Sequence, residues 1–193
     1  SGLNIMAAYN AVKELDNRYI HYEGSTRDKA EGTDLHSVMY PAVDHSRGGT
    51  TGSVISDANH PSTGKPYFMC EYAHAMGNAV GNLREYWEAI EGSKMGVGGC
   101  IWDWVDQSIY PYDAIKNNQL TKNGFPAYIT GFDCPGPHQY NFVNNGLVNA
   151  DRAWSAELDE VKRIYQWVGF DLNKDSRQVK LTNKYLDRNL NQF

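Results

Sequence analysis

The chain has 193 residues, with 18 Lys or Arg and 23 Asp or Glu, which gives a formal net charge of −5 at pH 7. This length fits one domain, or one domain and part of another. An acidic balance argues against general nucleic-acid binding, and no run of about 18 apolar residues predicts a membrane span. With 41% hydrophobic and 12% aromatic residues, the composition is typical of a packed protein rather than a disordered one.

The first third of the chain predicts one helix and two short strands. Apolar side chains recur at helical spacing over residues 3–15. Short strands are expected over residues 19–23 and 35–40. Residues 44–64 are rich in Gly, Ser, Thr, Asp and Asn and predict a long surface loop. Long loops in compact domains are often functional.

The middle of the chain alternates between strand and helix. Residues 67–70 and 98–102 are continuous apolar runs, which fit strands of a parallel sheet that is covered on both faces. Between them, residues 83–90 predict an amphipathic helix. Its apolar face comprises Leu83, Tyr86, Trp87 and Ile90. This order predicts the α/β class, with one connecting helix replaced by a loop.

The character of the chain changes in its last quarter. Residues 108–150 are irregular and rich in Pro, Gly and Asn, and residues 154–168 predict one more helix. Beyond it, residues 179–182 alternate between apolar and polar, as a half-exposed antiparallel strand does. We therefore divide the chain into a first domain over residues 1–168 and the start of a second over residues 169–193.

Polar side chains follow the expected buried strands at their carboxyl ends. Glu71 comes directly after Tyr-Phe-Met-Cys, and His74 lies three residues further on. The next run leads into Trp102-Asp103-Trp104-Val105-Asp106, and Tyr40 ends the preceding short strand. Working residues of α/β folds lie at this edge, where carboxylates can act as acid, base or sugar ligand. The pattern equally fits a structural role for Glu71, as a capped or ion-paired residue at a strand end.

Several blocks of the sequence resemble one enzyme family. Residues 70–78 (CEYAHAMGN) are similar to the nucleophile segment of the large bacterial β-galactosidases of glycoside hydrolase family 2. Residues 98–107 (GGCIWDWVDQ) resemble the last barrel strand of that family, at the family's spacing. Residues 145–148 and 150–152 resemble a third block, and Ser1-Gly2 resembles the end of the acid/base segment. The nine-residue block is very specific, because the β-glucuronidases and β-mannosidases of the same family carry a different version.

The resemblance implies a partial TIM (β/α)8 barrel, comprising about strands 5–8. Residues 3–107 would be the second half of the barrel, and residues 108–168 would be its tail. Residues from about 170 would form the first strands of an immunoglobulin-like β-sandwich. Because half a barrel leaves strand edges open, we expect the chain to form a homo-oligomer.

The resemblance further implies a retaining exo-β-galactosidase that acts on terminal β-D-galactosides, lactose-like or oligosaccharide. Glu71 matches the nucleophile that forms a covalent galactosyl–enzyme intermediate. Tyr40 matches a tyrosine that hydrogen-bonds to the nucleophile region, and His74 matches a histidine that contacts the sugar. Trp102 matches the platform under the galactose ring.

Metal ions are also implied by the resemblance. The carbonyl of Phe142 and the side chain of Asn145 match part of a Na⁺ site that helps to hold the 6-hydroxyl of the sugar, whereas the main Mg²⁺ ligands of the family are absent from this chain. The acid/base Glu would lie just upstream of Ser1, so we expect a piece of a longer protein that is inactive alone. Two other interpretations stay open: a non-catalytic carbohydrate-binding piece, and a family 2 hydrolase of another glycoside, such as a β-glucuronide.

Overall fold

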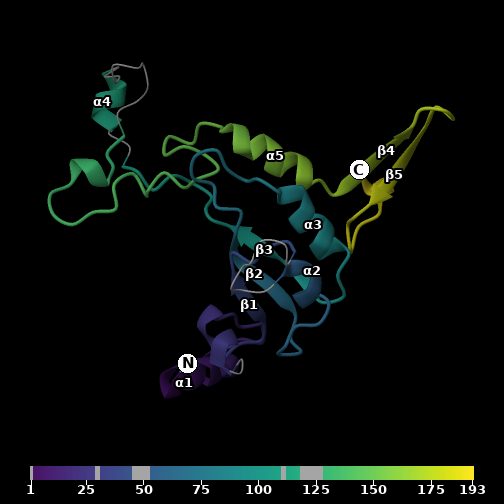
Figure 1. The fold of residues 1–193 in the computed structure, drawn as a ribbon, viewed down its shortest axis with the longest axis horizontal. Coiled ribbons are helices and arrows are strands. Elements are labelled where there is room, and N and C mark those ends of the chain that lie inside the picture. The colour runs from purple at the N-terminus through teal and green to yellow at the C-terminus, as the bar shows by residue number, and fades with distance from the viewer. Residues whose placement is uncertain (1, 29–30, 45–52, 110–111, 118–127) are drawn as a thin grey trace.

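The computed structural model describes residues 2–28, 31–44, 53–109, 112–117 and 128–193 (Figure 1). Its helices are α1 (Leu3–Leu15), α2 (Val54–Asp57), α3 (Leu83–Glu91), α4 (Tyr112–Lys116) and α5 (Ala156–Ile164). Its strands are β1 (His36–Met39), β2 (Tyr67–Tyr72), β3 (Gly96–Ile101), β4 (Val168–Asn173) and β5 (Gln178–Asn183). Short 3-10 helices are η1 (Glu23–Asp28), η3 (Gly131–Asp133) and η4 (Leu190–Gln192). Within the described ranges, no helix is long and apolar enough to cross a bilayer.

The strands β1, β2 and β3 form a parallel sheet in that order. Tyr67 of β2 pairs with His36 of β1 and with Gly96 of β3. Each connection between neighbouring strands carries a helix, α2 in the first and α3 in the second, and Figure 1 shows both helices on the same side of the sheet. This β–α–β–α–β arrangement is the repeating unit of an α/β barrel. It confirms the strands expected from the two continuous apolar runs.

The core lies between the sheet and these helices. The fully buried apolar side chains of β2, α2 and α3 belong to one cluster, which includes Tyr67, Met69, Tyr72, Val54 and Leu83. On α3, Ile90 is buried, while Tyr86 and Trp87 pack against the cluster, as the spacing predicted. Burial of one side chain of this size contributes about 1.5–3 kcal/mol. Packing against the helices therefore stabilises the sheet, and the residues at the strand ends are not needed for that packing.

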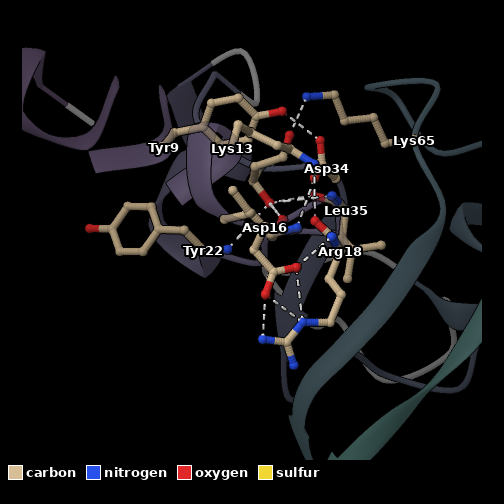
Figure 2. A network of polar contacts seen from close by, with 10 residues as sticks. Tyr9, Lys13, Asp16, Arg18, Tyr22, Asp34, Leu35 and Lys65 are labelled. Carbon is tan, nitrogen blue, oxygen red and sulfur yellow. Dashed lines mark hydrogen bonds and ion pairs between the residues drawn. The ribbon is translucent and has the colours of Figure 1, made fainter. Parts of the chain in front are cut away.

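The helix α1 has no fully buried residue, and a network of polar contacts links it to the segment that precedes β1. Figure 2 shows the centre of this network, Asp34, which precedes β1. Its carboxylate accepts hydrogen bonds from the hydroxyl of Tyr9 and the backbone amide of Ile20, both at 2.7 Å, and lies 2.8 Å from Nζ of Lys13. Burial opposes the charged form, but hydrogen bonds from Lys13, the Ile20 amide and Tyr9 outweigh it and lower the pKa of Asp34 to about 2.

Two expectations for the first third of the chain are wrong. Residues 19–22 join no strand, and Glu23 begins η1. The amide of Ile20 donates to the carboxylate of Asp34, and the amide of Tyr22 donates to the hydroxyl of Thr33. These backbone amides therefore bond to side chains and not to a neighbouring strand. The loop expected over residues 44–64 contains α2, which the buried side chain of Val54 anchors; residues 45–52 lie outside the described residues.

The helix expected over residues 154–168 is shorter, and it leads into a hairpin. Trp154 is held extended by a bridge to Val148, so α5 begins two residues later and ends at Ile164. The strands β4 and β5 then pair antiparallel, separately from the parallel sheet. Two strands do not make a sandwich, so the immunoglobulin-like domain and the division of the chain at residue 168 stay predictions.

Candidate active site

An irregularity in β2 sets the direction of Glu71. Tyr67 and Met69 are fully buried and share the face that packs toward the helices, so strict alternation would place Glu71 there too. The pairing shifts beyond Met69 on both sides: Met39 of β1 pairs with Glu71, leaving Cys70 out. The next fully buried residue is Tyr72. This β-bulge turns the Glu71 carboxylate to the face opposite the helices, and bulges often aim a side chain in this way beside active sites.

Tyr40 lies next to Glu71 across the sheet. Its backbone amide donates to the Glu71 carbonyl at 2.8 Å. Burial raises the pKa of Tyr40, and so do the negative charge of Glu71 and the hydrogen bond between the two side chains. The phenol therefore keeps its proton and donates a hydrogen bond to the carboxylate. This contact brings together two residues that the sequence proposed from separate strands.

His74 lies between the rings of Tyr40 and Phe142, with centroid distances of 5.9 Å and 5.5 Å. Its Nδ1 accepts a hydrogen bond from the amide of Met76 at 3.2 Å, which places the ring proton on Nε2. The Nε2 atom is buried and has no hydrogen-bond partner among the described residues. His74 thus presents an unused donor beside the ring of Tyr40.

The end of β3 is joined to the same place through the backbone. The carbonyl of Trp102 accepts from the amide of Ala75 at 2.7 Å, and its amide donates to the carbonyl of Tyr72 at 3.2 Å. The amide of Asp103 donates to the carbonyl of Asn145 at 2.8 Å. The Trp102 indole is half-buried, which leaves part of its surface for a ligand.

Asn145 and Phe142 lie together on one turn. The Asn145 side chain is 1% exposed, and its Nδ2 donates to the Phe142 carbonyl at 3.4 Å. Its Oδ1 has no partner within the described part of the chain. Because hard cations prefer oxygen ligands, a buried unpaired amide oxygen beside a carbonyl fits the Na⁺ site that the resemblance implies. In the described ranges, no three His, Cys, Asp or Glu side chains gather as a metal site.

Buried polar atoms without a partner gather around these segments. Among the described residues they include Nε2 of His74 and the Oδ1 atoms of Asp103, Asn144 and Asn145. Buried polar groups are normally hydrogen-bonded, so such a gathering indicates a place built for a ligand. Sequence reasoning did not single out Asn144, and it named Asp103 only as one carboxylate of a motif, because the missing partner is visible only in three dimensions.

Backbone strain marks the same region. Tyr40 and Ala73 have φ angles of +46° and +45°. For a non-glycine residue this conformation costs of order 1–3 kcal/mol and persists only where the surroundings impose it. The two residues follow β1 and β2 directly, so the strain falls where the site residues leave the sheet.

Residues 1–170 match the family model described as "Glycosyl hydrolases family 2, TIM barrel domain". The chain belongs to glycosyl hydrolase family 2. In this TIM-barrel domain, β1–β3 supply part of the barrel wall, and Tyr40, Glu71 and Trp102 stand at the carboxyl ends of those strands, where barrel enzymes place their active sites. Membership of family 2 implies a parent protein that hydrolyses glycosides.

Proposed function

We propose that this chain carries the nucleophile of a retaining exo-β-galactosidase, and that the nucleophile is Glu71. The observation that carries the proposal is the bulge in β2, which turns Glu71 away from the core and toward the phenol of Tyr40. A carboxylate with only a structural role at a strand end would not need a bulge to turn it. The unused donor on His74 and the strained backbone at Tyr40 support the same assignment.

The proposed reaction has two displacements. A Glu71 carboxylate oxygen attacks the anomeric carbon while the bond to the leaving oxygen breaks, and a general acid protonates that oxygen. Water, which gives its proton to the conjugate base of that acid, then attacks the anomeric carbon and breaks its bond to Glu71, so that the carboxylate is restored. The hydrogen bond from Tyr40 holds the attacking group in place, and the raised pKa of its phenol keeps that donor protonated.

The general acid is not assigned to a residue of this chain. Retaining enzymes place the two carboxyl groups about 5–5.5 Å apart. Asp106 is a carboxylate that the sequence suggested as a partner, but its Oδ1 accepts the amide of Gly146 at 2.8 Å, which gives it a structural task. The resemblance places the acid/base Glu just upstream of Ser1, so full turnover is proposed for a polypeptide that includes it.

Galactose recognition is proposed for the other residues of the site. Trp102 would stack under the sugar ring, and Nε2 of His74 would donate to a hydroxyl. Phe142 and Asn145 would hold a Na⁺ ion, which supplies an electrostatic contact to the 6-hydroxyl. These roles rest on the resemblance together with the unpaired atoms of His74 and Asn145.

The first testable prediction is covalent labelling of Glu71. The full-length protein that contains this chain is treated with 2-deoxy-2-fluoro-β-galactosyl fluoride, whose fluorine slows breakdown of the intermediate, and the adduct is located by peptide mass mapping. One added sugar on Glu71 is expected, and Glu71→Gln should abolish labelling and lower turnover by about 10⁴-fold or more.

Other outcomes identify the alternatives. Faster labelling by the corresponding glucuronyl or glucosyl fluoride would show that the substrate is another β-glycoside and not a galactoside. Sugar binding without an adduct would favour a carbohydrate-binding role. An adduct on a different carboxylate would overturn the assignment of Glu71. Asp106→Asn serves as a matched control, because it removes a carboxylate that is expected to take no adduct.

A further inference from the structure

The strand pairing around Glu71 is irregular. The pairing of β2 shifts register at this residue on both of its sides, toward β1 and toward β3. The next residue, Tyr72, resumes the pairing with Ile101 of β3, and its carbonyl accepts a 3.2 Å hydrogen bond from the amide of Trp102. A bulge leaves a residue out of the ladder and bends the strand. The direction of Glu71 therefore depends on what fixes the residues beside it.

The side chain of Tyr72 supplies a second attachment. Tyr72 is fully buried, and its hydroxyl accepts a hydrogen bond from Nε1 of Trp87 at 2.8 Å and shares another with the hydroxyl of Tyr165. The rings of Trp87 and Tyr165 also meet edge to face, with centroids 4.8 Å apart. Burial raises the pKa of Tyr72 and of Tyr165, so both hydroxyls keep the protons that the hydrogen bonds need.

The three groups come from three elements. Tyr72 ends β2, Trp87 lies on α3, and Tyr165 is the C-terminal cap of α5. Two helices on the outer side of the sheet thus hold the residue that follows Glu71. Tyr67, on the same face of the same strand, differs: its hydroxyl is buried but has no partner in the described ranges.

We propose that Tyr72 is a positioning residue, whose hydroxyl, held by Trp87 and Tyr165, fixes the bulge that aims Glu71 at the anomeric carbon. The proposal rests on the function proposed for Glu71. It differs from an ordinary core role because removal of one hydroxyl should disturb the chemical step in molecules that are fully folded.

The experiment compares Tyr72→Phe with Tyr67→Phe in the full-length protein. Both variants remove one buried hydroxyl from β2, but only the first breaks hydrogen bonds. We expect Tyr72→Phe to lower the rate constant of inactivation by 2-deoxy-2-fluoro-β-galactosyl fluoride about tenfold or more, with little change in the concentration that half-saturates the rate, since small misplacement of a reacting group is costly. Tyr67→Phe should inactivate at the wild-type rate. Rates are expressed per folded molecule, from circular dichroism and thermal unfolding.

A second readout does not depend on activity. The amide of Tyr40 donates to the carbonyl of Glu71, so its hydrogen exchange reports how firmly the bulge is held. Exchange at Tyr40 should be severalfold faster in Tyr72→Phe than in Tyr67→Phe. Tyr165→Phe removes the other hydroxyl, at the end of α5, and should also speed exchange at Tyr40, but to a smaller extent. This variant is used for the test if Tyr72→Phe does not fold.

The outcomes separate the two proposals. If wild-type protein is labelled on Glu71 and Tyr72→Phe reacts at the wild-type rate, the positioning role is overturned and the nucleophile stands. If the wild type takes no label on Glu71, the proposed function is overturned, and exchange at Tyr40 then decides whether the hydroxyl holds the bulge. Equal exchange in the two Phe variants would overturn the positioning role in either case.

Discussion

At the scale of single residues, Asp34 shows how one carboxylate can help to attach a helix that has no fully buried residue. It joins Tyr9 and Lys13 of α1 to the backbone at Ile20 (Figure 2). The folded state holds the charged form, with a pKa of about 2, below the ordinary value near 3.9. The stabilisation from Asp34 is therefore complete above about pH 4 and is lost as the pH falls through the folded pKa toward 2.

This predicts a pH-dependent effect of Asp34→Asn. The variant should unfold at a lower urea concentration than the wild type at pH 6, and the difference should shrink steadily between pH 4 and about pH 2. Urea unfolding followed by circular dichroism at several pH values measures it. Asp175→Asn, in the exposed turn of the hairpin, serves as the control. A difference that stays constant over this range would show that Asp34 contributes through packing rather than charge.

The sequence predicted the site residues that directly follow the ends of strands. Glu71, His74 and Trp102 stand at the carboxyl ends of strands that apolar runs reveal, and the structure joins them to Tyr40 and to the turn at Asn145. The Tyr72–Trp87–Tyr165 contacts could not be found in this way. They join residues up to 93 positions apart, and an aromatic on an apolar face looks the same in sequence whether or not its hydroxyl has a partner.

At the scale of elements, the close approach of β2 and β3 depends on a glycine. Gly99 pairs with Met69, and a Cβ at Gly99 would lie 2.8 Å from both Cβ and the carbonyl oxygen of Met69. The backbone of Met69 cannot rotate out of the way as the end of a flexible side chain can, so the two strands would have to move apart. The sequence predicted both strands but not the bulge, because register is a relation between strands that no single segment contains.

We therefore predict that Gly99→Ala lowers the free energy of unfolding by about 1–3 kcal/mol, as overpacking does in a well-packed region. Chemical denaturation monitored by tryptophan fluorescence checks this. Gly81→Ala provides the comparison, since a Cβ there meets nothing within 4 Å, and it should be neutral or slightly stabilising. Equal midpoints for the two variants would mean that β2 and β3 tolerate a wider spacing.

At the scale of the whole molecule, the parallel sheet ends at β3. In the part of the chain that the structure describes, the second edge of β3 pairs with no strand, and Val97 on it is 58% exposed. An unpaired strand edge with apolar side chains is a template for association. The homo-oligomer that we expect from the sequence has a physical basis in this edge.

Residues 1–193 studied by themselves should thus associate. Light scattering after size exclusion should give a mass above 21.7 kDa that rises with concentration. Val97→Lys, which adds a charge to the edge strand, should shift the mass toward the monomer, whereas Leu186→Lys, at an exposed position outside the strands, should not. A stable mass of 21.7 kDa at every concentration would contradict the prediction.

The extra residue in β2 has a consequence for the depth of the site. Deleting Cys70 would restore regular pairing beyond Met69 and keep Glu71 and Tyr72 on their present faces, because the alternation would then run without interruption. The strand would be shorter by about 3.3 Å, however, and the carboxylate would be drawn back by that distance. The position of the Glu71 carboxylate along the strand therefore depends on the number of residues in β2 as much as on their identity.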